Sequence, residues 1–444
     1  MNAVAFNPAL VRSYDMRGVV GDTLLEADAR GLGLAFAAYA RARGAGRLAV
    51  ARDGRLSSSA LAAALVDGLV AGGAAVIDLG LGPTPIVHWA ARVLGLDGGV
   101  MVTGSHNPAD QNGFKLGLFG EPVWGEALAA LAAQPGDPLA GGSVKQANVG
   151  ELFAAFLASA AAGAPALRVV WDCGHGATGP VLARVVARLP GRHRLLYAEP
   201  DGRFPAHHPD PSEPANMTDL QAAVMADGAD LGIAFDGDGD RIGVVGPDGR
   251  ILWPDQVMLL LARGVLARAP GAAIVADVKS SAALFDGVAA LGGRAVMCPA
   301  GYVRVRAAML AAGAPLAGEM SGHIFFAERG ADDALYVGMR LLAALAQTSL
   351  PAFVASLPAL VATPEIRLAA RDAAGIVARV SVRMPGAVTT DGVRMTVEGG
   401  WWLLRASGTE DKLTARVEAR DTAALARVRR ALAAVLAVEG VGLP

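Results

Sequence analysis

Short runs rich in β-forming residues alternate with longer segments rich in alanine and leucine through most of the chain. The runs at 47–53, 74–80 and 98–104, for example, are separated by helical stretches such as 58–73. Strands that alternate with helical segments form βαβ units, whose strands lie mostly parallel within one sheet. Because the pattern recurs about three times, it predicts three related α/β domains with mixed sheets.

The last part of the chain has a different pattern. Closely spaced short strands with glycine turns occupy residues 381–420, and a single helical segment follows at 421–440. This arrangement predicts a smaller C-terminal α+β domain. A chain of 444 residues is too long for one hydrophobic core, and about 150 residues per domain gives roughly three domains, with four within reach. Breaks rich in glycine and proline set the expected domain limits, which are 1–147, 148–249, 250–361 and 362–444.

Composition excludes several classes of protein. Hydrophobic residues make up 53% of the chain, but glycines and charged residues interrupt the most apolar stretches, so that none offers about 20 lipid-facing residues. The two cysteines, Cys173 and Cys298, provide no disulfide framework, and the first residues lack the basic and apolar segments of a signal peptide. A net charge of −2 gives no electrostatic footprint for nucleic acid. These features predict a cytoplasmic protein that binds neither membrane nor nucleic acid.

The stretch AFDGDGDR places three carboxylates within five residues, directly after an apolar run. Two unit charges about 4 Å apart repel by roughly 4 kcal/mol at an effective dielectric constant of about 20, so such a cluster implies a cation. Hard oxygen ligands suit Mg²⁺ or Ca²⁺, and the glycines let Asp236, Asp238 and Asp240 converge. The spacing is not that of an EF-hand, because Arg241 and Pro247 stand where glycine and glutamate are required. An exposed acidic turn is the alternative.

A second polar stretch, TGSHNP, follows the apolar run GVMV. Three roles are open for Ser105 in this stretch, namely a helix cap, a nucleophile and a phosphate carrier. The nucleophile-elbow pattern GxSxG is absent, because other residues hold the positions of its glycines. The Asn112-Gly113 pair further along is a turn signal. The stretch therefore predicts a strand that ends before Ser105, a loop, a turn and a second strand that Lys115 enters.

Two further polar stretches suit the recognition of a sugar phosphate. In GEMSGH, Glu319, Ser321 and His323 alternate, so on an extended segment they face the same way and can hydrogen-bond adjacent hydroxyls of a sugar. In RASGTEDK a guanidinium, two hydroxyls and the N–H groups around a glycine suit a phosphate dianion. The residues of that second set are Arg405, Ser407, Gly408 and Thr409. A polar loop and an ordinary turn are the respective alternatives.

The stretch DCGHGATG has glycines in the GxGxxG spacing after the strand-like run LRVVWD, with Glu199 and Asp201 about twenty residues further on. This spacing matches a dinucleotide-binding fingerprint. In a chain with 56 glycines, a tight turn that packs a helix against its strand gives the same match. Taken alone, the stretch leaves an NAD(P)-dependent oxidoreductase open as an alternative function.

Together, TGSHNP, DGDGDR, GEMSGH and RASGTE, in this order and spacing, resemble the motifs of the α-D-phosphohexomutases. The resemblance covers nearly the whole chain and includes YDMRG, ARDGRLSS, DCGHGATG, HHPDPSEPAN, DVKSS and TPEIR. GEMSGH is similar to the bacterial phosphomannomutase/phosphoglucomutase branch, because phosphoglucosamine mutases usually have glutamine at the position of Met320. The resemblance implies three related α/β domains and a smaller fourth one around a central active-site cleft, and it makes the GxGxxG stretch a structural turn.

The same resemblance implies a phosphohexomutase that interconverts hexose 6-phosphate and hexose 1-phosphate, with mannose, glucose or both as the sugar. Ser105 matches the residue that carries the phosphoryl group, which passes through a hexose 1,6-bisphosphate intermediate. Mg²⁺ is the implied cofactor, and its implied ligands are Ser105, Asp236, Asp238 and Asp240. Hexose phosphates are then the partners, without nucleic acid or membrane, and a monomer or a dimer is expected.

By this resemblance, Lys115, Arg241 and His106 match residues beside the transferring phosphoryl group, and His323 is the candidate general base. The implied substrate-binding residues are Tyr14, Arg17, Lys279, Glu319, Ser321, His323, Arg405, Ser407, Gly408 and Thr409. Within this set, Glu319 and Ser321 match residues that hold O3 and O4 of the sugar, and the last four match a clamp on the non-reacting phosphate.

The chain departs from the family pattern in three places. Tyr302 follows Gly301 where many relatives have histidine, and His175 replaces the asparagine of DCGNG. RASGTE is closer to the clamp of phosphoglucosamine mutases than to the asparagine-containing version of the mannose and glucose enzymes. Phosphoglucosamine mutase is therefore the alternative activity, and an NAD(P)-dependent oxidoreductase is the alternative of another class.

Overall fold

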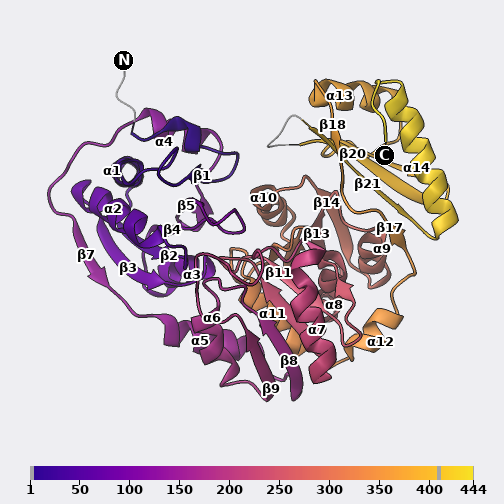
Figure 1. Ribbon diagram of the computed structural model, residues 1–444, viewed down its shortest axis with the longest axis horizontal. Helices are drawn as coiled ribbons and strands as arrows, with labels where there is room; N and C mark the ends of the chain where they lie inside the picture. Colours follow the sequence, from indigo (N-terminus) through magenta and orange to yellow (C-terminus); the bar gives the residue numbers. More distant parts are fainter. Residues whose placement is uncertain (1–4, 408–411, 444) are drawn as a thin grey trace. The chain divides into compact units, whose positions relative to one another are not determined.

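The structure is a computed structural model that describes residues 5–407 and 412–443 (Figure 1). The chain forms two compact units, Met1–Leu261 with Ser321–Pro351 and Ala262–Met320 with Ala352–Pro444. Two of the predicted site residues, Gly408 and Thr409, lie outside the described residues.

The first α/β module, residues 8–146, belongs wholly to the first unit. Its elements are η1 (Pro8–Leu10), β1 (Met16–Val19), α1 (Glu26–Arg41), β2 (Arg47–Arg52), α2 (Ser58–Ala71), β3 (Ala75–Leu81), α3 (Pro85–Val93), β4 (Gly98–Val102), β5 (Gln111–Leu118), β6 (Glu121–Pro122), α4 (Glu126–Ala133) and β7 (Ser143–Gln146). The sheet order is β1-β5-β4-β2-β3-β7, with β6 paired to β5. Strands β4, β2, β3 and β7 are parallel, whereas β5 is antiparallel to β1, β4 and β6.

Strand β4 is buried along its whole length, which explains its continuous apolar sequence. Helices α1 and α2 pack together, and their apolar residues join those of the strands in one core that includes Phe36, Leu65, Val100 and Phe114. Because β4 ends at Val102, the polar stretch that follows emerges at the carboxyl edge of the parallel strands, where α/β folds place their sites.

The second α/β module, residues 150–252, also belongs to the first unit. Its elements are α5 (Gly150–Ala160), β8 (Leu167–Asp172), α6 (Gly179–Val186), β9 (Gly191–Leu196), η2 (Pro214–Met217), α7 (Thr218–Asp227), β10 (Leu231–Phe235), β11 (Ile242–Val245) and β12 (Ile251–Leu252). The sheet order is β12-β11-β10-β8-β9. Strands β10, β8 and β9 are parallel, and β11 is antiparallel to β10 and β12. The acidic loop joins β10 to β11, again at the carboxyl edge of the parallel strands.

The third α/β module, residues 254–355, contributes to both units. Its elements are α8 (Pro254–Arg268), β13 (Ala273–Asp277), α9 (Ala282–Ala290), β14 (Arg294–Cys298), α10 (Tyr302–Ala312), β15 (Leu316–Gly318), β16 (Ile324–Phe326), α11 (Ala334–Ala344) and α12 (Leu350–Ala355). In the second unit β13 pairs in parallel with β14 and β15. Helix α11 belongs to the first unit, where it packs against β10 and β11.

The C-terminal module, residues 361–437, belongs to the second unit and is drawn in orange to yellow in Figure 1. Its elements are β17 (Val361–Ala362), β18 (Ile366–Ala369), α13 (Ala373–Arg383), β19 (Val393–Val397), β20 (Gly400–Ala406), β21 (Lys412–Ala419) and α14 (Thr422–Ala437). All of its strand pairs are antiparallel, in the order β17-β21-β20-β19 with β18 beside β21. Helices α13 and α14 pack against the sheet through a core that includes Ile376, Trp402, Val428 and Leu432.

These modules confirm the predicted fold class, which is three α/β domains with mixed sheets and a smaller α+β domain at the C-terminus. The domain limits at 147, 249 and 361 stay predictions.

One expectation about local structure is wrong. Asn112 and Gly113 lie inside β5 rather than in a turn. A β-carbon on Gly113 would lie 1.8 Å from the carbonyl oxygen of Met16 in β1, so the close approach of the two strands requires glycine. The Asn112 amide donates to the hydroxyls of Ser57 and Ser58. Contacts between distant parts of the chain therefore override the local turn preference.

The expectation of an extended segment at 319–323 is also wrong. Strand β15 ends at Gly318, β16 begins at Ile324, and a turn that includes Gly322 with φ of 102° lies between them. The alternation of the three polar side chains in GEMSGH therefore does not place them on one face. Glu319 belongs to the second unit, whereas Ser321 and His323 belong to the first.

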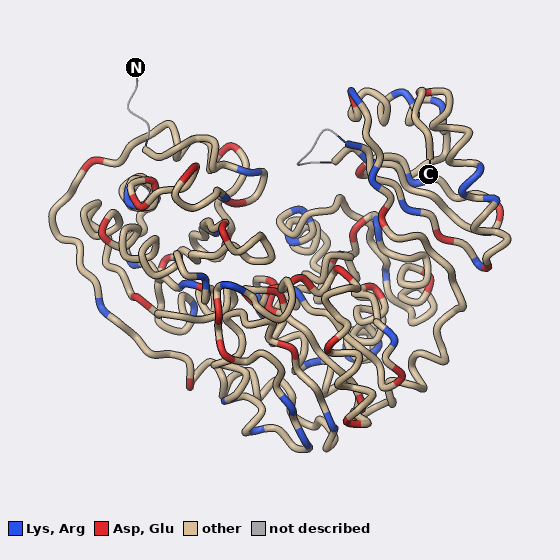
Figure 2. Tube along the Cα trace, in the orientation of Figure 1, with Lys and Arg blue, Asp and Glu red and all other residues tan. Residues whose placement is uncertain are grey.

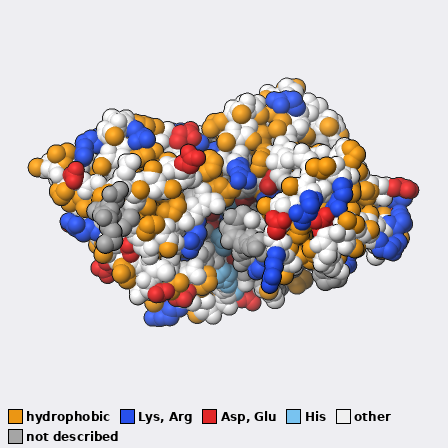
Figure 3. Space-filling view, turned by 90° about the horizontal axis from the view of Figure 1, so that it is seen from above, with side chains coloured by type: hydrophobic (Ala, Val, Ile, Leu, Met, Phe, Trp, Pro, Cys, Tyr) orange, Lys and Arg blue, Asp and Glu red, His pale blue; other side chains and the backbone are white. Residues whose placement is uncertain are grey.

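Charged side chains of both signs are distributed along the chain. In Figure 2, lysines and arginines are interspersed with acidic residues along the trace. The face drawn in Figure 3 likewise carries both signs of charge among hydrophobic and uncharged side chains. No helix within the described residues is both long and apolar enough to cross a membrane.

Candidate active site

Ser105 lies in the loop between β4 and β5, where no helix begins, so it is not a helix cap. Its backbone has φ of 49°, a conformation that few residues other than glycine adopt, and the residue is 2% exposed. The Ser105 hydroxyl donates to Oδ2 of Asp236 at 2.7 Å, and Nδ1 of His106 lies 3.2 Å from the same hydroxyl oxygen. The fold thus brings the serine of TGSHNP onto the acidic loop of the second module.

The Ser105 loop is held by a buried ion pair, Asp53 and Arg55, which follows β2. Asp53 accepts hydrogen bonds from the Thr103 hydroxyl and from the Gly104 N–H. The Arg55 guanidinium donates to four backbone carbonyl oxygens of the loop, those of Ser105, Asn107, Pro108 and Gln111. A strained backbone conformation costs on the order of 1–3 kcal/mol. The hydrogen bonds that Asp53 and Arg55 make with the loop offset that cost.

The acidic loop 236–241 curls around one carboxylate oxygen. Oδ1 of Asp236 accepts from three backbone N–H groups of the loop at 3.0 to 3.1 Å. The carboxylates of Asp236, Asp238 and Asp240 approach to within 4.8 Å of one another. Asp236 and Asp238 are 0% exposed and Asp240 is 2% exposed, so the alternative of an exposed acidic turn is wrong.

Lys115 of β5 neutralises part of this charge. Its Nζ donates to Oδ2 of Asp238 at 2.7 Å and to Oδ2 of Asp240. Although burial acts in the opposite direction, the two carboxylates raise the pKa of Lys115, so the ammonium group stays charged. Lys115 in turn lowers the pKa of Asp238 against the effect of burial. The Thr84 hydroxyl, directly before α3, donates to the same Asp238 oxygen.

The acidic loop retains features that a cation satisfies. Among the described residues, Oδ1 of Asp238 and Oδ1 of Asp240 are buried without a hydrogen-bond partner. Burial, together with the carboxylates of Asp240 and Asp238, raises the pKa of Asp236 well above its usual range. Buried carboxylate oxygens that accept no hydrogen bond, in a cluster of three aspartates, are the ligands that a hard divalent cation takes. The donor set therefore fits a bound metal ion.

Further basic groups surround Ser105. Arg17, which is 7% exposed, bonds the carboxylate of Asp15 and the Thr103 carbonyl oxygen. Arg241, and after it burial, lowers the pKa of His106 well below its usual value, so the imidazole is neutral. The guanidinium groups of Arg17 and Arg241 and the ammonium group of Lys115 suit a dianion near the serine.

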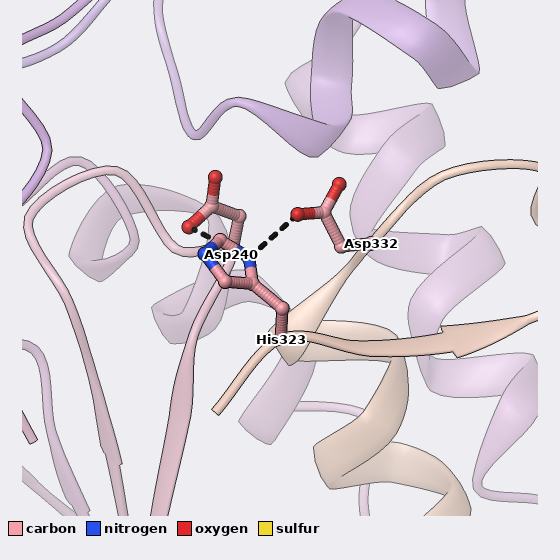
Figure 4. Close-up of side chains that lie close together, drawn as sticks. All are labelled: Asp240, His323 and Asp332. Carbon is pink, nitrogen blue, oxygen red and sulfur yellow. Dashed lines mark hydrogen bonds and ion pairs between the residues drawn. The ribbon is translucent and has the colours of Figure 1, made fainter. Parts of the chain in front are cut away.

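His323 lies between two carboxylates, as Figure 4 shows. Its Nδ1 is 2.6 Å from Oδ2 of Asp332 and 3.6 Å from Oδ1 of Asp240, and its Nε2 accepts from Nε of Arg241 at 3.0 Å. Burial acts to lower the pKa of His323, but Asp240 and Asp332 raise it above its usual value. Nδ1 of His323 therefore contacts two carboxylates, and Nε2 accepts from the Arg241 guanidinium.

Two other predicted residues of the first unit are Tyr14 and Ser321. The ring of Tyr14 lies 6.0 Å from that of Trp124, measured between centroids. Ser321 lies in the turn before β16. The stretch DCGHGATG forms the turn between β8 and α6, and the Ala177 N–H within it donates to the Gly237 carbonyl oxygen at 2.9 Å. This stretch therefore supports the acidic loop as a structural turn.

The remaining predicted residues, Lys279, Glu319, Arg405 and Ser407, all belong to the second unit. Nζ of Lys279 lies 3.9 Å from the Asp277 carboxylate, and Glu319 is 6% exposed. Arg405 is the second-last residue of β20, and its side chain is 13% exposed. The structure thus assembles Ser105, the aspartates, Lys115, Arg17, Arg241, His106 and His323 in one unit, and the predicted sugar and phosphate contacts largely in the other.

Sequence reasoning missed four residues of this site. Asp53 and Arg55 lie in the stretch ARDGRLSS. Their spacing does not predict that they bind a loop about fifty residues further along the chain. Thr84 has no local signal. Asp332 is the first of two adjacent aspartates before α11, and the second, Asp333, accepts from the Tyr336 N–H as the helix cap. Only one of these two adjacent aspartates can cap the helix, and this could have indicated that the other has a different role.

Comparison with known proteins matches successive parts of the chain to the same family. Models of the phosphoglucomutase/phosphomannomutase family match alpha/beta/alpha domain I at residues 8–131, domain II at 151–249, domain III at 253–360 and the C-terminal domain at 360–435. A phosphomannomutase/phosphoglucomutase of Pseudomonas aeruginosa is 42% identical over 434 residues, which is 95% of this chain and 94% of the relative.

Two further comparisons agree. A phosphoglucomutase of Neisseria gonorrhoeae is 38% identical over 443 residues, which is 96% of each chain. The crystal structure of a phosphoglucomutase/phosphomannomutase family protein from Burkholderia thailandensis has a TM-score of 0.91 at 40% identity, and the match covers 99% of this chain and 100% of that one.

Proposed function

The chain belongs to the phosphoglucomutase/phosphomannomutase family of hexose phosphate mutases, and we propose that it exchanges phosphate between O6 and O1 of mannose and glucose through a phosphorylated Ser105. The observation that carries this proposal is the buried Ser105 hydroxyl on the Asp236 carboxylate, 2.7 Å away, beside the Lys115 bridge between Asp238 and Asp240. A serine held among three carboxylates and three basic side chains is suited to phosphoryl transfer rather than to acyl transfer.

The proposed reaction has two transfers. In the first, a sugar hydroxyl oxygen forms a bond to the phosphorus of phospho-Ser105, the bond from phosphorus to Oγ breaks, and the hydroxyl proton passes to a base. The product is a hexose 1,6-bisphosphate, which then offers its other phosphate to Oγ of Ser105. The Ser105 oxygen attacks that phosphorus, and the sugar oxygen leaves with a proton. Phosphate is conserved overall, and the bisphosphate also serves as the activator that loads the unphosphorylated enzyme.

Charge decides which groups the transfer needs. Three aspartates and a phosphoserine of about −1.5 to −2 charge exceed the charge of Lys115. Mg²⁺ held by Ser105, Asp236, Asp238 and Asp240 would supply the missing charge neutralisation at the transferring phosphoryl group. Lys115 and Arg241 contribute the remaining positive charge, and Arg17 holds the loop that carries the serine through the Thr103 carbonyl oxygen.

Removal of the metal is expected to abolish most of the activity. EDTA-treated enzyme should regain its rate with added Mg²⁺, and Asp238→Asn should lower kcat by on the order of 100-fold or more with a small change in the melting temperature. The physical reason is that Asp238 presents a buried, unpaired oxygen, which the amide replaces with a neutral and weaker ligand. Coupled kinetics and thermal unfolding measure the two effects. A full rate in EDTA would exclude a metal-dependent transfer.

Arg55→Lys is expected to lower kcat about 10- to 100-fold, because a lysine cannot reach four carbonyl oxygens at once. The loop would then hold Ser105 less closely at Asp236. Stopped-flow or coupled mutase kinetics measure the loss, and Arg52→Lys, at the half-buried last position of β2, is the matched control. Equal rates for the two variants would show that the loop does not depend on Arg55.

His323 stays the candidate general base. Its raised pKa suits a proton acceptor, and the nearby Asp332 carboxylate would stabilise the imidazolium. Proton uptake at Nε2 replaces the hydrogen bond that Nε2 now accepts from Arg241. The two proposed roles are therefore linked. When the Arg241 guanidinium turns from His323 to the phosphoryl group, Nε2 of His323 can accept a proton.

For the sugar phosphate itself, we infer that Glu319 and Ser321 bind ring hydroxyls and that Lys279, Arg405 and Ser407 bind phosphate. Gly408 and Thr409 complete the proposed clamp by their place in the sequence. Glu319 is 6% exposed, and the Gly301 N–H donates to its Oε2 at 2.7 Å, which would hold the carboxylate in place for a ring hydroxyl. The clamp must accept either phosphate of the bisphosphate, which permits both orientations of the sugar.

A side-by-side assay tests the proposed specificity. We expect mannose 1-phosphate and glucose 1-phosphate to be turned over with similar kcat/KM and glucosamine 6-phosphate poorly, because Met320 stands in GEMSGH. All three substrates are measured with glucose 1,6-bisphosphate and Mg²⁺ present. A kcat/KM that favours the glucosamine sugar would assign the chain to the phosphoglucosamine mutases, as its RASGTE stretch suggests.

A further inference from the structure

Asp391 of the second unit connects three parts of the chain. It stands in the turn directly before β19, and one of its carboxylate oxygens, Oδ2, is the acceptor of three hydrogen bonds. Two come from Arg405 at the end of β20, from Nε at 3.0 Å and from Nη2 at 2.6 Å. The third comes from the backbone N–H of Ala300, in the loop between β14 and α10, at 2.9 Å.

The contact between Asp391 and Arg405 depends on the adjacent residue, Gly392. Gly392 has φ of 86°, and a β-carbon at this position would lie 2.3 Å from the carbonyl oxygen of Leu404 and 2.6 Å from Cγ of Arg405. Only glycine allows the turn to lie so close to β20. The Asp391-Gly392 pair therefore sets a carboxylate directly against the Arg405 guanidinium.

The contact continues to Glu319. Gly301, next to Ala300, donates its N–H to Oε2 of Glu319 at 2.7 Å. Arg405 is therefore connected to Glu319 in three steps. Arg405 donates to Asp391, Asp391 accepts from the N–H of Ala300, and the next residue, Gly301, donates to the Glu319 carboxylate. The path joins the C-terminal module to the third α/β module within the second unit.

The attachment of the C-terminal module does not depend on Asp391, because other residues provide it. Arg394 donates to the carbonyl oxygens of Val278 and Ser280 and stacks on Trp401, 3.6 Å from the ring centroid. Oε1 of Glu418 accepts from the Trp401 indole and from the Ala282 N–H. These buried contacts hold the loop 278–282 against the module, so loss of Asp391 leaves the two parts docked.

We propose that Asp391, which the Ala300 N–H holds in turn, is a positioning residue that fixes Arg405 for the binding of the substrate's non-reacting phosphate. The inference rests on the proposed function, in which Arg405 and Glu319 contact the substrate. A guanidinium has five N–H donors, and Asp391 uses two of Arg405's at one edge, so it sets the direction of the others. Preorganisation of a long side chain in this way raises affinity by lowering the entropy lost on binding.

The test is a cycle of variants measured with glucose 1-phosphate at saturating glucose 1,6-bisphosphate. Asp391→Ala is expected to raise KM about tenfold, since a charge-assisted contact that orients the clamp is lost. Arg405→Ala should raise KM by more, and the double variant should match Arg405→Ala, because Asp391 acts only through that arginine. Asp391→Asn, which keeps an acceptor oxygen, should lie between the parent and Asp391→Ala.

A matched control comes from the same module. Asp421 caps α14 by accepting from the Ala424 N–H at 2.7 Å and has a side chain that is 53% exposed. Asp421→Ala therefore lowers the melting temperature without a change in KM. If Asp391→Ala does not fold, the same cycle is run with Asp391→Asn, for which a rise in KM that vanishes in the Arg405→Ala background is expected.

The outcomes separate this inference from the proposed function. An unchanged KM in Arg405→Ala would overturn the phosphate clamp and the inference that depends on it. A raised KM in Arg405→Ala with an unchanged KM in Asp391→Ala, or in Asp391→Asn where that variant replaces it, would overturn the positioning role alone. Additive effects in the double variant would also overturn it, because they would show that Asp391 acts independently of Arg405.

Discussion

The Ser105→Ala protein is expected to fold and yet to interconvert glucose 1-phosphate and glucose 6-phosphate on the order of 10⁴-fold more slowly than the parent enzyme. The substitution removes the oxygen that accepts the phosphoryl group and leaves the basic groups and the acidic loop in place. It also leaves Oδ2 of Asp236 without the hydroxyl that it now accepts from, which costs about 1–3 kcal/mol of stability. Coupled mutase kinetics and urea unfolding measure the two effects separately.

A second variant removes backbone strain as an explanation. Ser105 has φ of 49°, which alanine adopts at a cost and glycine adopts freely. Ser105→Gly should therefore be at least as stable as Ser105→Ala and equally inactive. If either variant retained a rate within tenfold of the parent, the phosphoryl carrier would have to be another residue.

Lys115→Met is expected to have the second largest effect, because it leaves two buried carboxylates without their shared cation. Breaking a buried ion pair by removing one partner lowers the free energy of unfolding by about 3–5 kcal/mol. The rate should also fall on the order of 100- to 1000-fold, since the ammonium group stabilises charge at the transferring phosphoryl group. Added Mg²⁺ should restore part of the stability and little of the rate.

Arg30→Met in the same module is the control for Lys115→Met. Arg30 and Asp67 form an ion pair of 2.6 Å, but their side chains are 50% and 64% exposed, so its loss should cost at most about 1 kcal/mol. Urea unfolding with EDTA and with Mg²⁺ measures both variants. Equal midpoints for the two proteins would contradict the buried charge balance described for the acidic loop.

The parts of this protein that could be predicted from sequence are those with short-range causes. Three aspartates spaced by glycines converge on their own loop, so the chemistry of Asp236, Asp238 and Asp240 follows from local spacing. The fold class follows similarly, because period and length of the apolar runs distinguish strands from helices. Ser105 needed the resemblance as well, since its local pattern left a cap, a nucleophile and a phosphate carrier open.

The parts that could not be predicted depend on contacts between distant segments. Asn112-Gly113 is a good turn sequence, yet β1 lies against Gly113 and places both residues in a strand. Arg55 supports a loop about fifty residues further along the chain, and Asp391 supports the distant Arg405. Such residues carry no periodic or compositional signal, because their partners are chosen by the tertiary fold.

The most direct test of the central claim is the mass of the enzyme after incubation with glucose 1,6-bisphosphate and Mg²⁺. Intact-mass and phosphopeptide analysis should show one added phosphoryl group, located on Ser105. When that group carries an isotopic label, the label should pass to added glucose 1-phosphate or mannose 1-phosphate. The Ser105→Ala protein should gain no phosphate under the same conditions. An active enzyme whose Ser105 peptide stays unmodified throughout turnover would contradict the account.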